Sequence, residues 1–197
     1  GKIMAELKKL GLDKNTVVVL LGDHGWSLGD HNQWCKHSNF NIVNNAPLII
    51  KVPGNQKKGA EPKVVEFVDV YPTLCEAVGL PVPHHTEGES MMKLMTGEDK
   101  SWKDCAIIKW HSGVTYFDRD YGYTQWNDKA GNFQGHMLFL YRNDHLETKN
   151  VADAPENKEI VAQLQKEILA RRGKDFMKQV PKADKPERKG TQAHKRK

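Results

Sequence analysis

The sequence of 197 residues has no long apolar run and no apolar leader at its start. The run at 17–21 contains five apolar residues, whereas a membrane-spanning helix needs roughly 20, so no transmembrane segment is predicted. The chain begins with Gly1 rather than Met, and we expect the natural N-terminus to lie upstream. The lack of a leader therefore leaves the cellular compartment open.

Cysteine is also scarce, with Cys35, Cys75 and Cys105 widely spaced along the chain. An odd, sparse set without a C-x-x-C pair excludes a disulfide framework. Cys75 lies within an apolar helical pattern, which predicts a small buried side chain rather than a reactive one.

Net charge is close to zero outside the last twenty residues. The formal net charge is +5, but residues 178–197 alone contain eight Lys and Arg against two Asp and Glu. A neutral body gives no support to a folded nucleic-acid-binding face, and no nucleic-acid partner is expected. Residues 178–197 have almost no large apolar side chain and are predicted to form a basic disordered tail.

The first hundred residues have an α/β pattern. The predicted elements are helices at 2–10, 69–78 and 90–95 and strands at 17–21 and 47–52. Both strands are apolar at consecutive positions, which is typical of central, fully buried strands. A polar cluster follows the first of them, and ligands of open α/β sheets bind at the carboxyl ends of strands.

The pattern changes after about residue 100. Strands are predicted at 105–110, 121–126 and 135–141, with a turn at 129–132, and an amphipathic helix is predicted at 156–172. Antiparallel strands followed by one helix indicate a small α+β unit.

The residues with chemical potential are concentrated between positions 23 and 37. Asp23 and His24, at the end of the first strand, could ligate a divalent metal, and Lys36 could bind an anionic oxygen. Two other interpretations remain open: loop caps with surface histidines, or a zinc site, although the spacings match no standard zinc pattern. The zinc set would be His24, His31, Cys35 and His37.

The order of motifs along the chain resembles the C-terminal portion of the sulfatases, in the branch that includes iduronate-2-sulfatase, within the alkaline phosphatase superfamily. The first matching segment is GDHGWSLGDH at 22–31, followed by WCKHSNF at 34–40. Further segments follow in the same order: APLII at 46–50, VDVYPTL at 68–74, EGES at 87–90, YGYTQW at 121–126 and ETKNVA at 147–152.

This resemblance implies a fold and a set of roles. The fold class is α/β: residues 1–100 would be the C-terminal part of the sulfatase catalytic domain, with a mixed sheet flanked by helices. Residues 101–177 would be a small subdomain with an antiparallel sheet and one helix. Asp23 and His24 match metal-site residues that help to hold calcium, and Lys36 matches the catalytic lysine that contacts the substrate sulfate.

Other parts of a sulfatase site are missing from this sequence. The nucleophile, formylglycine, is made from Cys or Ser in C/S-x-P/A-x-R, and no Cys or Ser stands four positions before any of the six arginines. The paired aspartates that complete the calcium site are also absent. The resemblance therefore implies the C-terminal part of a sulfuric ester hydrolase with half a calcium site, inactive alone, with formylglycine in the missing N-terminal part.

The expected substrate is a sulfated carbohydrate or another sulfate ester, and the expected location is periplasmic, secreted or lysosomal. One alternative is a fragment of a phosphatase or phosphonate hydrolase of the same superfamily. The other is a non-catalytic relic that binds sulfated glycans or other anions. No role is assigned to Asp30, His31, His37 or His111.

Overall fold

The computed structural model describes residues 1–98 and 101–178 and confirms the α/β class. Its helices are α1 (Lys2–Lys9), α2 (Asn41–Asn44), α3 (Val70–Ala77), α4 (Met92–Thr96) and α5 (Lys158–Phe176). Its strands are β1 (Val18–Leu21), β2 (Leu48–Lys51), β3 (Ala106–Trp110), β4 (Gly113–Phe117), β5 (Tyr121–Asn127) and β6 (Phe133–Leu140). Short 3-10 turns lie at η1 (Leu12–Lys14), η2 (Asp30–Asn32), η3 (Phe67–Asp69) and η4 (Pro155–Asn157).

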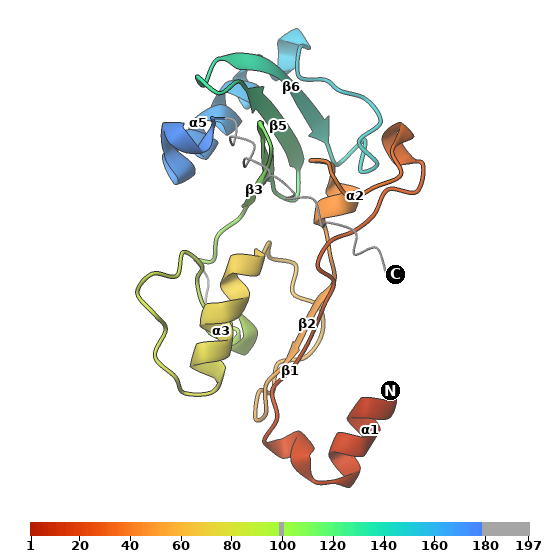
Figure 1. Cartoon of the computed structure of the whole chain (residues 1–197), viewed down its shortest axis with the longest axis vertical. Helices are drawn as coiled ribbons and strands as arrows, with labels where there is room; N and C mark the ends of the chain where they lie inside the picture. The colour runs from red at the N-terminus through yellow and green to blue at the C-terminus, as the bar shows by residue number, and fades with distance from the viewer. Residues whose placement is uncertain (99–100, 179–197) are drawn as a thin grey trace, which may run out of the picture.

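Strands β3 to β6 form a four-stranded antiparallel sheet in sequential order, with α5 on one side of it (Figure 1). The sequence interpretation missed β4, which lies between β3 and β5 and is buried along its whole length. Its alternation is masked because Thr115, although polar, is buried and hydrogen bonds to Thr124 of β5 at 2.9 Å. A hydrogen-bonded hydroxyl can occupy a core position at little cost.

Helix α5 supplies the core of this part. Val161, Leu164 and Ile168 are buried against the sheet, as the helical spacing predicted. Leu169, the next residue along the helix, is 41% exposed. The helix continues beyond the predicted end, with a break in helical geometry at Gly173.

Strands β1 and β2 form a separate antiparallel ribbon, and the prediction of central, fully buried strands is wrong. No residue of β1 is buried, and Leu20 and its cross-strand partner Ile49 are 56% and 62% exposed. The physical reason is that other elements cover only one face of the ribbon. Leu48 and Ile50 pack against a small cluster of Met91, Leu94 and Trp102, and the opposite face has no such cover among the described residues.

The division of the chain at residue 100 stays a prediction. Before that position, the loop at 22–45 leaves the ribbon and reaches the four-stranded sheet, so α2 lies beside that sheet in Figure 1. In the part of the chain that the structure describes, no helix is long and apolar enough to cross a membrane. The predicted basic tail lies outside the described residues from position 179 onward.

Candidate functional site

The loop at 22–45 begins where β1 ends, and backbone hydrogen bonds fold it back on itself. The Gly25 N–H donates to Val43 O of α2 at 2.6 Å, and the Ser27 N–H donates to Cys35 O at 2.9 Å. Residue 25 has to be glycine, because a Cβ there would stand 1.9 Å from Ile42 O. The second contact brings Lys36 back beside the end of β1.

The structure brings together the three residues singled out from the sequence, Asp23, His24 and Lys36. Lys36 Nζ lies 2.7 Å from His24 Nε2, and His24 Nδ1 lies 2.6 Å from Gly25 O. An ammonium group can only donate and a carbonyl oxygen can only accept. Nδ1 therefore carries a proton, and in the neutral form of the ring the lone pair of Nε2 faces Lys36.

Asp23 Oδ2 lies 3.2 Å from the same His24 Nε2. The Asp23 side chain is 81% exposed and that of His24 is 26% exposed, so both are open to a ligand. Two ligands bound to one calcium ion at about 2.4 Å and at right angles are about 3.4 Å apart. The carboxylate and the ring nitrogen have a spacing that fits two ligands of one cation, with oxygen the donor that calcium prefers.

The zinc interpretation does not hold for the described residues. Among residues 1–98 and 101–178, no group of three or more His, Cys, Asp or Glu lies close enough to hold a metal ion. The candidate zinc ligands have other contacts: His31 stacks on Phe40 at 3.7 Å and His37 stacks on Trp110 at 4.9 Å between ring centroids.

The structure also shows where Asp30 and His111 lie, two residues to which the sequence assigned no role. Asp30 accepts a hydrogen bond from the Leu28 N–H within the loop. His111 occupies the β3–β4 turn with a left-handed backbone (φ 51°) and meets Trp110 edge-on. His37, Trp110 and His111 thus form one aromatic group. His37 directly follows Lys36 in the sequence.

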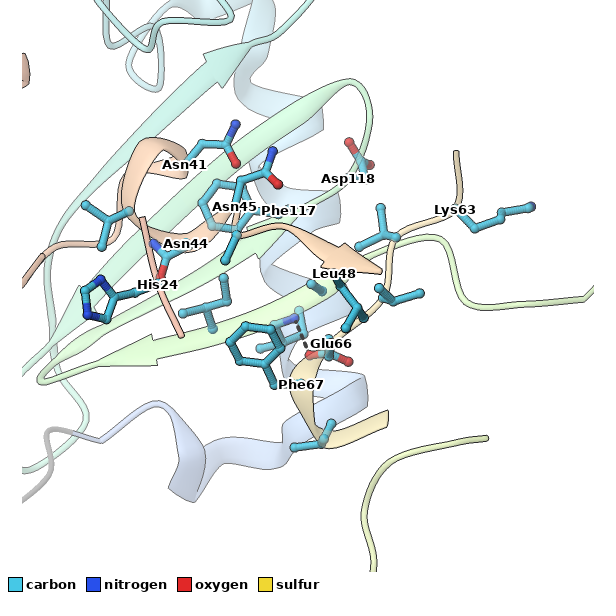
Figure 2. Close-up of a pocket in the computed structure, with 18 of the residues that line it drawn as sticks. His24, Asn41, Asn44, Asn45, Leu48, Lys63, Glu66, Phe67, Phe117 and Asp118 are labelled. Carbon is cyan, nitrogen blue, oxygen red and sulfur yellow. Dashed lines mark hydrogen bonds between the residues drawn. The ribbon is translucent and has the colours of Figure 1, made fainter. Parts of the chain in front are cut away.

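A cavity of about 680 Å³ adjoins His24. Figure 2 shows His24 at one end of it, Asn41, Asn44 and Asn45 along the α2 segment, and Glu66 and Phe67 farther away. The cavity lies between the loop, β2 and β3, so the candidate site opens onto a space large enough for a sugar-sized ligand.

Sequence reasoning missed a cluster of charged residues around Glu66, which lines this cavity. Lys103 Nζ lies 2.7 Å from Glu66 Oε2 and 2.7 Å from Asp69 Oδ2, and Asp69 is fully buried. Burial lowers the pKa of Lys103, but its hydrogen bonds to Asp69 and Glu66 outweigh that effect, and the pKa is raised overall. Lys103 lies 34 positions after Asp69, so no local pattern indicates this pairing.

The sequence that builds this fold matches a domain of the sulfatase type. The chain belongs to the sulfatase family described as N-sulphoglucosamine sulphohydrolase, C-terminal, whose model matches residues 29–174.

Curated proteins with similar sequences are also sulfatases. The Delta 4,5-hexuronate-2-O-sulfatase of Bacteroides thetaiotaomicron is 31% identical, over 76% of this chain and 33% of that protein. The iduronate 2-sulfatase of Mus musculus is 32% identical, over 42% of this chain and 20% of that protein. The chain therefore spans a fifth to a third of the length of these relatives.

A solved structure shares the fold at lower identity. The phosphonate monoester hydrolase of Silicibacter pomeroyi superposes with a TM-score of 0.78 and 23% identity, over 88% of this chain and 38% of that chain. The fold by itself is thus common to sulfatases and phosphonate hydrolases.

Proposed function

We propose that this chain is the C-terminal part of a sulfuric ester hydrolase that acts on a sulfated carbohydrate. The observation that carries the proposal is the contact of Lys36 Nζ with His24 Nε2, 2.7 Å apart, beside the Asp23 carboxylate. One cationic group and two candidate metal ligands then converge on one point at the edge of a cavity. A sulfate ester, which carries negative charge on its oxygens, is a ligand that such a group can neutralise.

Each of the three residues has a proposed role. Lys36 is the catalytic residue that donates to a sulfate oxygen and stabilises negative charge on the ester as the bond to the leaving oxygen breaks. Asp23 and His24 hold half of a calcium site. A bound calcium ion would polarise the sulfate oxygens. His24 can offer Nε2 to a cation, because Gly25 O holds a ring proton on Nδ1.

The remaining groups lie outside this sequence in the proposal. The formylglycine nucleophile and the other calcium ligands belong to an N-terminal part, which is a partner of this chain in the intact enzyme. The chain alone is therefore expected to be inactive. We place the enzyme in a periplasmic, secreted or lysosomal compartment, as the family resemblance implied.

Sulfatase function is favoured over phosphonate hydrolysis by the relatives with higher identity. The two curated relatives named above are sulfatases at 32% and 31% identity, whereas the phosphonate hydrolase is 23% identical. Both sulfatase names refer to 2-sulfated hexuronates, so a 2-O-sulfated uronate disaccharide is the first substrate to test.

A binding titration on this chain tests the proposal, with the fluorescence of Trp26 as the signal. The Trp26 side chain is 47% exposed, and its ring centroid lies 5.9 Å from that of His24. We expect saturable binding of the sulfated disaccharide that weakens at least tenfold in Lys36→Ala. The control Lys129→Ala, on the exposed β5–β6 turn, should bind like the wild type.

Two outcomes would contradict the proposal. Equal binding by Lys36→Ala and wild type would remove the lysine from the site. Binding that is lost when residues 179–197 are deleted, but not in Lys36→Ala, would favour the non-catalytic, anion-binding alternative.

A further inference from the structure

The loop that carries the candidate site is anchored to the four-stranded sheet by contacts between residues far apart in sequence. Asn39 Nδ2 donates to Thr115 Oγ1 of β4 at 2.8 Å, and Asn39 is 5% exposed. The Asn41 N–H at the start of α2 donates to Glu147 Oε2 at 2.8 Å. The loop is thus attached to the sheet on both sides of Phe40.

Glu147 has an unusual environment for a carboxylate. It is 4% exposed and has a left-handed backbone (φ 57°), which is uncommon for a residue other than glycine. Its second oxygen, Oε1, accepts a hydrogen bond from Tyr141 Oη at 2.8 Å. Burial raises the pKa of Glu147, so a charged carboxylate here is costly in comparison with an apolar side chain.

A glycine on β5 leaves space for the Glu147 carboxylate and for Tyr141. A Cβ on Gly122 of β5 would stand 2.2 Å from Tyr141 Oη and 3.0 Å from Glu147 Oε1. The segments YGYTQW and ETKNVA, which the proposed function leaves unexplained, therefore meet at one buried contact. A costly buried carboxylate with dedicated space indicates a role beyond filling the core.

Hydrogen bonds joined by short stretches of backbone connect Glu147 with Lys36. Glu147 Oε2 accepts from the Asn41 N–H, the first residue of α2, and in the same helix Val43 O accepts from the Gly25 N–H. Gly25 O then holds His24 Nδ1, and His24 Nε2 faces Lys36 Nζ. Figure 2 shows Asn41 and His24 on neighbouring segments of this loop.

We propose that Glu147 is a positioning residue that, through α2, fixes the orientation of His24 and hence of Lys36. The consequence for sulfate recognition rests on the proposed function, whereas the effect on the His24 ring does not. Glu147 acts at a distance and touches neither the ring nor the proposed ligand.

The test compares Glu147→Leu, Glu147→Gln and the wild-type chain. Leucine removes the acceptor for Asn41, whereas glutamine can offer its carbonyl oxygen to Asn41 and its amide to Tyr141 Oη. We expect Leu to populate a second His24 tautomer in ¹⁵N NMR spectra and to speed labelling of the loop thiol Cys35 by about tenfold. Glu147→Gln should keep the wild-type His24 tautomer, and its rate of Cys35 labelling should lie within about threefold of the wild type.

Two further variants keep the result interpretable. Leu164→Ala creates a cavity under α5, far from Glu147 in sequence, and should lower stability without changing the His24 spectrum. If Glu147→Leu does not fold, Asn41→Pro removes the same N–H at the first position of α2, where proline is tolerated. It should then give the same change in tautomer and labelling.

The outcomes separate this inference from the proposed function. A folded Glu147→Leu with wild-type His24 signals and Cys35 labelling would overturn the positioning role, whatever the chain binds. A changed His24 spectrum in a chain whose wild type binds no sulfated disaccharide would support positioning and contradict the proposed function. A changed spectrum together with binding weakened about tenfold supports both.

Discussion

At the scale of single residues, the site depends on which atoms can donate and which can accept. His24 has the Gly25 carbonyl oxygen beside Nδ1 and the Lys36 ammonium beside Nε2, so its neutral form has the proton on Nδ1 and the lone pair on Nε2. The lone pair at Nε2 can accept a hydrogen bond from Lys36 or bind a metal ion. Lys36 and a cation are therefore expected to compete for His24 unless the lysine moves towards the sulfate.

Replacing Lys36 tests the catalytic role. In the complete enzyme, Lys36→Ala should lower kcat/KM by roughly 10²–10³-fold, because it removes a charge directed at the reacting group. Release of sulfate from the 2-O-sulfated disaccharide is the measurement, with Lys129→Ala as the control. An unchanged kcat/KM in Lys36→Ala would exclude the assignment.

The three cysteines should differ sharply in reactivity. Burial raises the pKa of Cys105 to about 11, and Cys75 is 7% exposed, whereas Cys35 is partly exposed in the loop. At pH 8 a thiol reagent should therefore modify Cys35 at least tenfold faster than the other two. Mass spectrometry of the labelled native chain gives the rates, and comparable labelling of Cys105 would show that the core opens readily.

At the scale of elements, the loop at 22–45 depends on the four-stranded sheet as well as on its own hydrogen bonds. Gly113 and Gly122 on these strands lie where a side chain would displace Asn39 or Tyr141. The sheet therefore has glycine at the two places where Asn39 of the loop and Tyr141, the partner of Glu147, lie against it. Strand propensity would favour larger residues at both positions, so their absence follows from the contact.

Substituting Gly122 tests this element-level contact. Gly122→Ala should lower the free energy of unfolding by about 1–3 kcal/mol, because the new methyl group would overlap Tyr141 Oη. Urea denaturation measures the loss. Adding Tyr141→Phe removes the overlapping oxygen and should recover part of it, and strictly additive losses would contradict the overlap.

At the scale of the whole molecule, the charged cluster connects the segment before α3 with the four-stranded sheet and α5. Glu66 and Asp69 precede α3, Lys103 precedes β3, and Arg172 of α5 lies 3.5 Å from Glu66. The Ile107 N–H of β3 also donates to Glu66 at 3.0 Å. Removing Lys103 would take its cationic partner from the fully buried Asp69 carboxylate.

Lys103→Met should therefore cost about 3–5 kcal/mol of unfolding free energy at pH 7. The raised pKa of Lys103 fixes the pH dependence: its contribution is fully present below the unfolded pKa of about 10.4 and is lost as pH rises through the folded pKa. The difference between wild type and Lys103→Met should shrink above about pH 10.4. Urea titrations from pH 7 to 11 measure it, and a difference independent of pH would contradict the assignment.

The open face of the ribbon should make this chain associate with itself. Leu20 and Ile49 are opposite each other on β1 and β2 and both are more than half exposed, and exposed apolar strands promote association. Leu20→Glu with Ile49→Lys should reduce concentration-dependent association in sedimentation velocity. The matched control is Ile3→Lys, also exposed but on α1. An equal effect of the control would remove the ribbon as the cause.

The sequence by itself determined the family, most elements and the residues of the candidate site. Local spacing was sufficient for α5, because its apolar face recurs every third or fourth residue and packs on one sheet. It was also sufficient to bring Asp23, His24 and Lys36 into one loop, since they lie within 14 consecutive positions. Their roles in metal and sulfate binding stay proposals.

Tertiary structure alone decided what depends on partners distant in sequence. The apolar pattern of β1 predicted a buried strand, but burial depends on which elements cover it, and sequence periodicity does not contain that information. Glu147 lies 106 positions after Asn41 and Lys103 lies 34 positions after Asp69. A buried carboxylate is tolerated only where folding supplies its donors, so these contacts become visible only when the chain is folded.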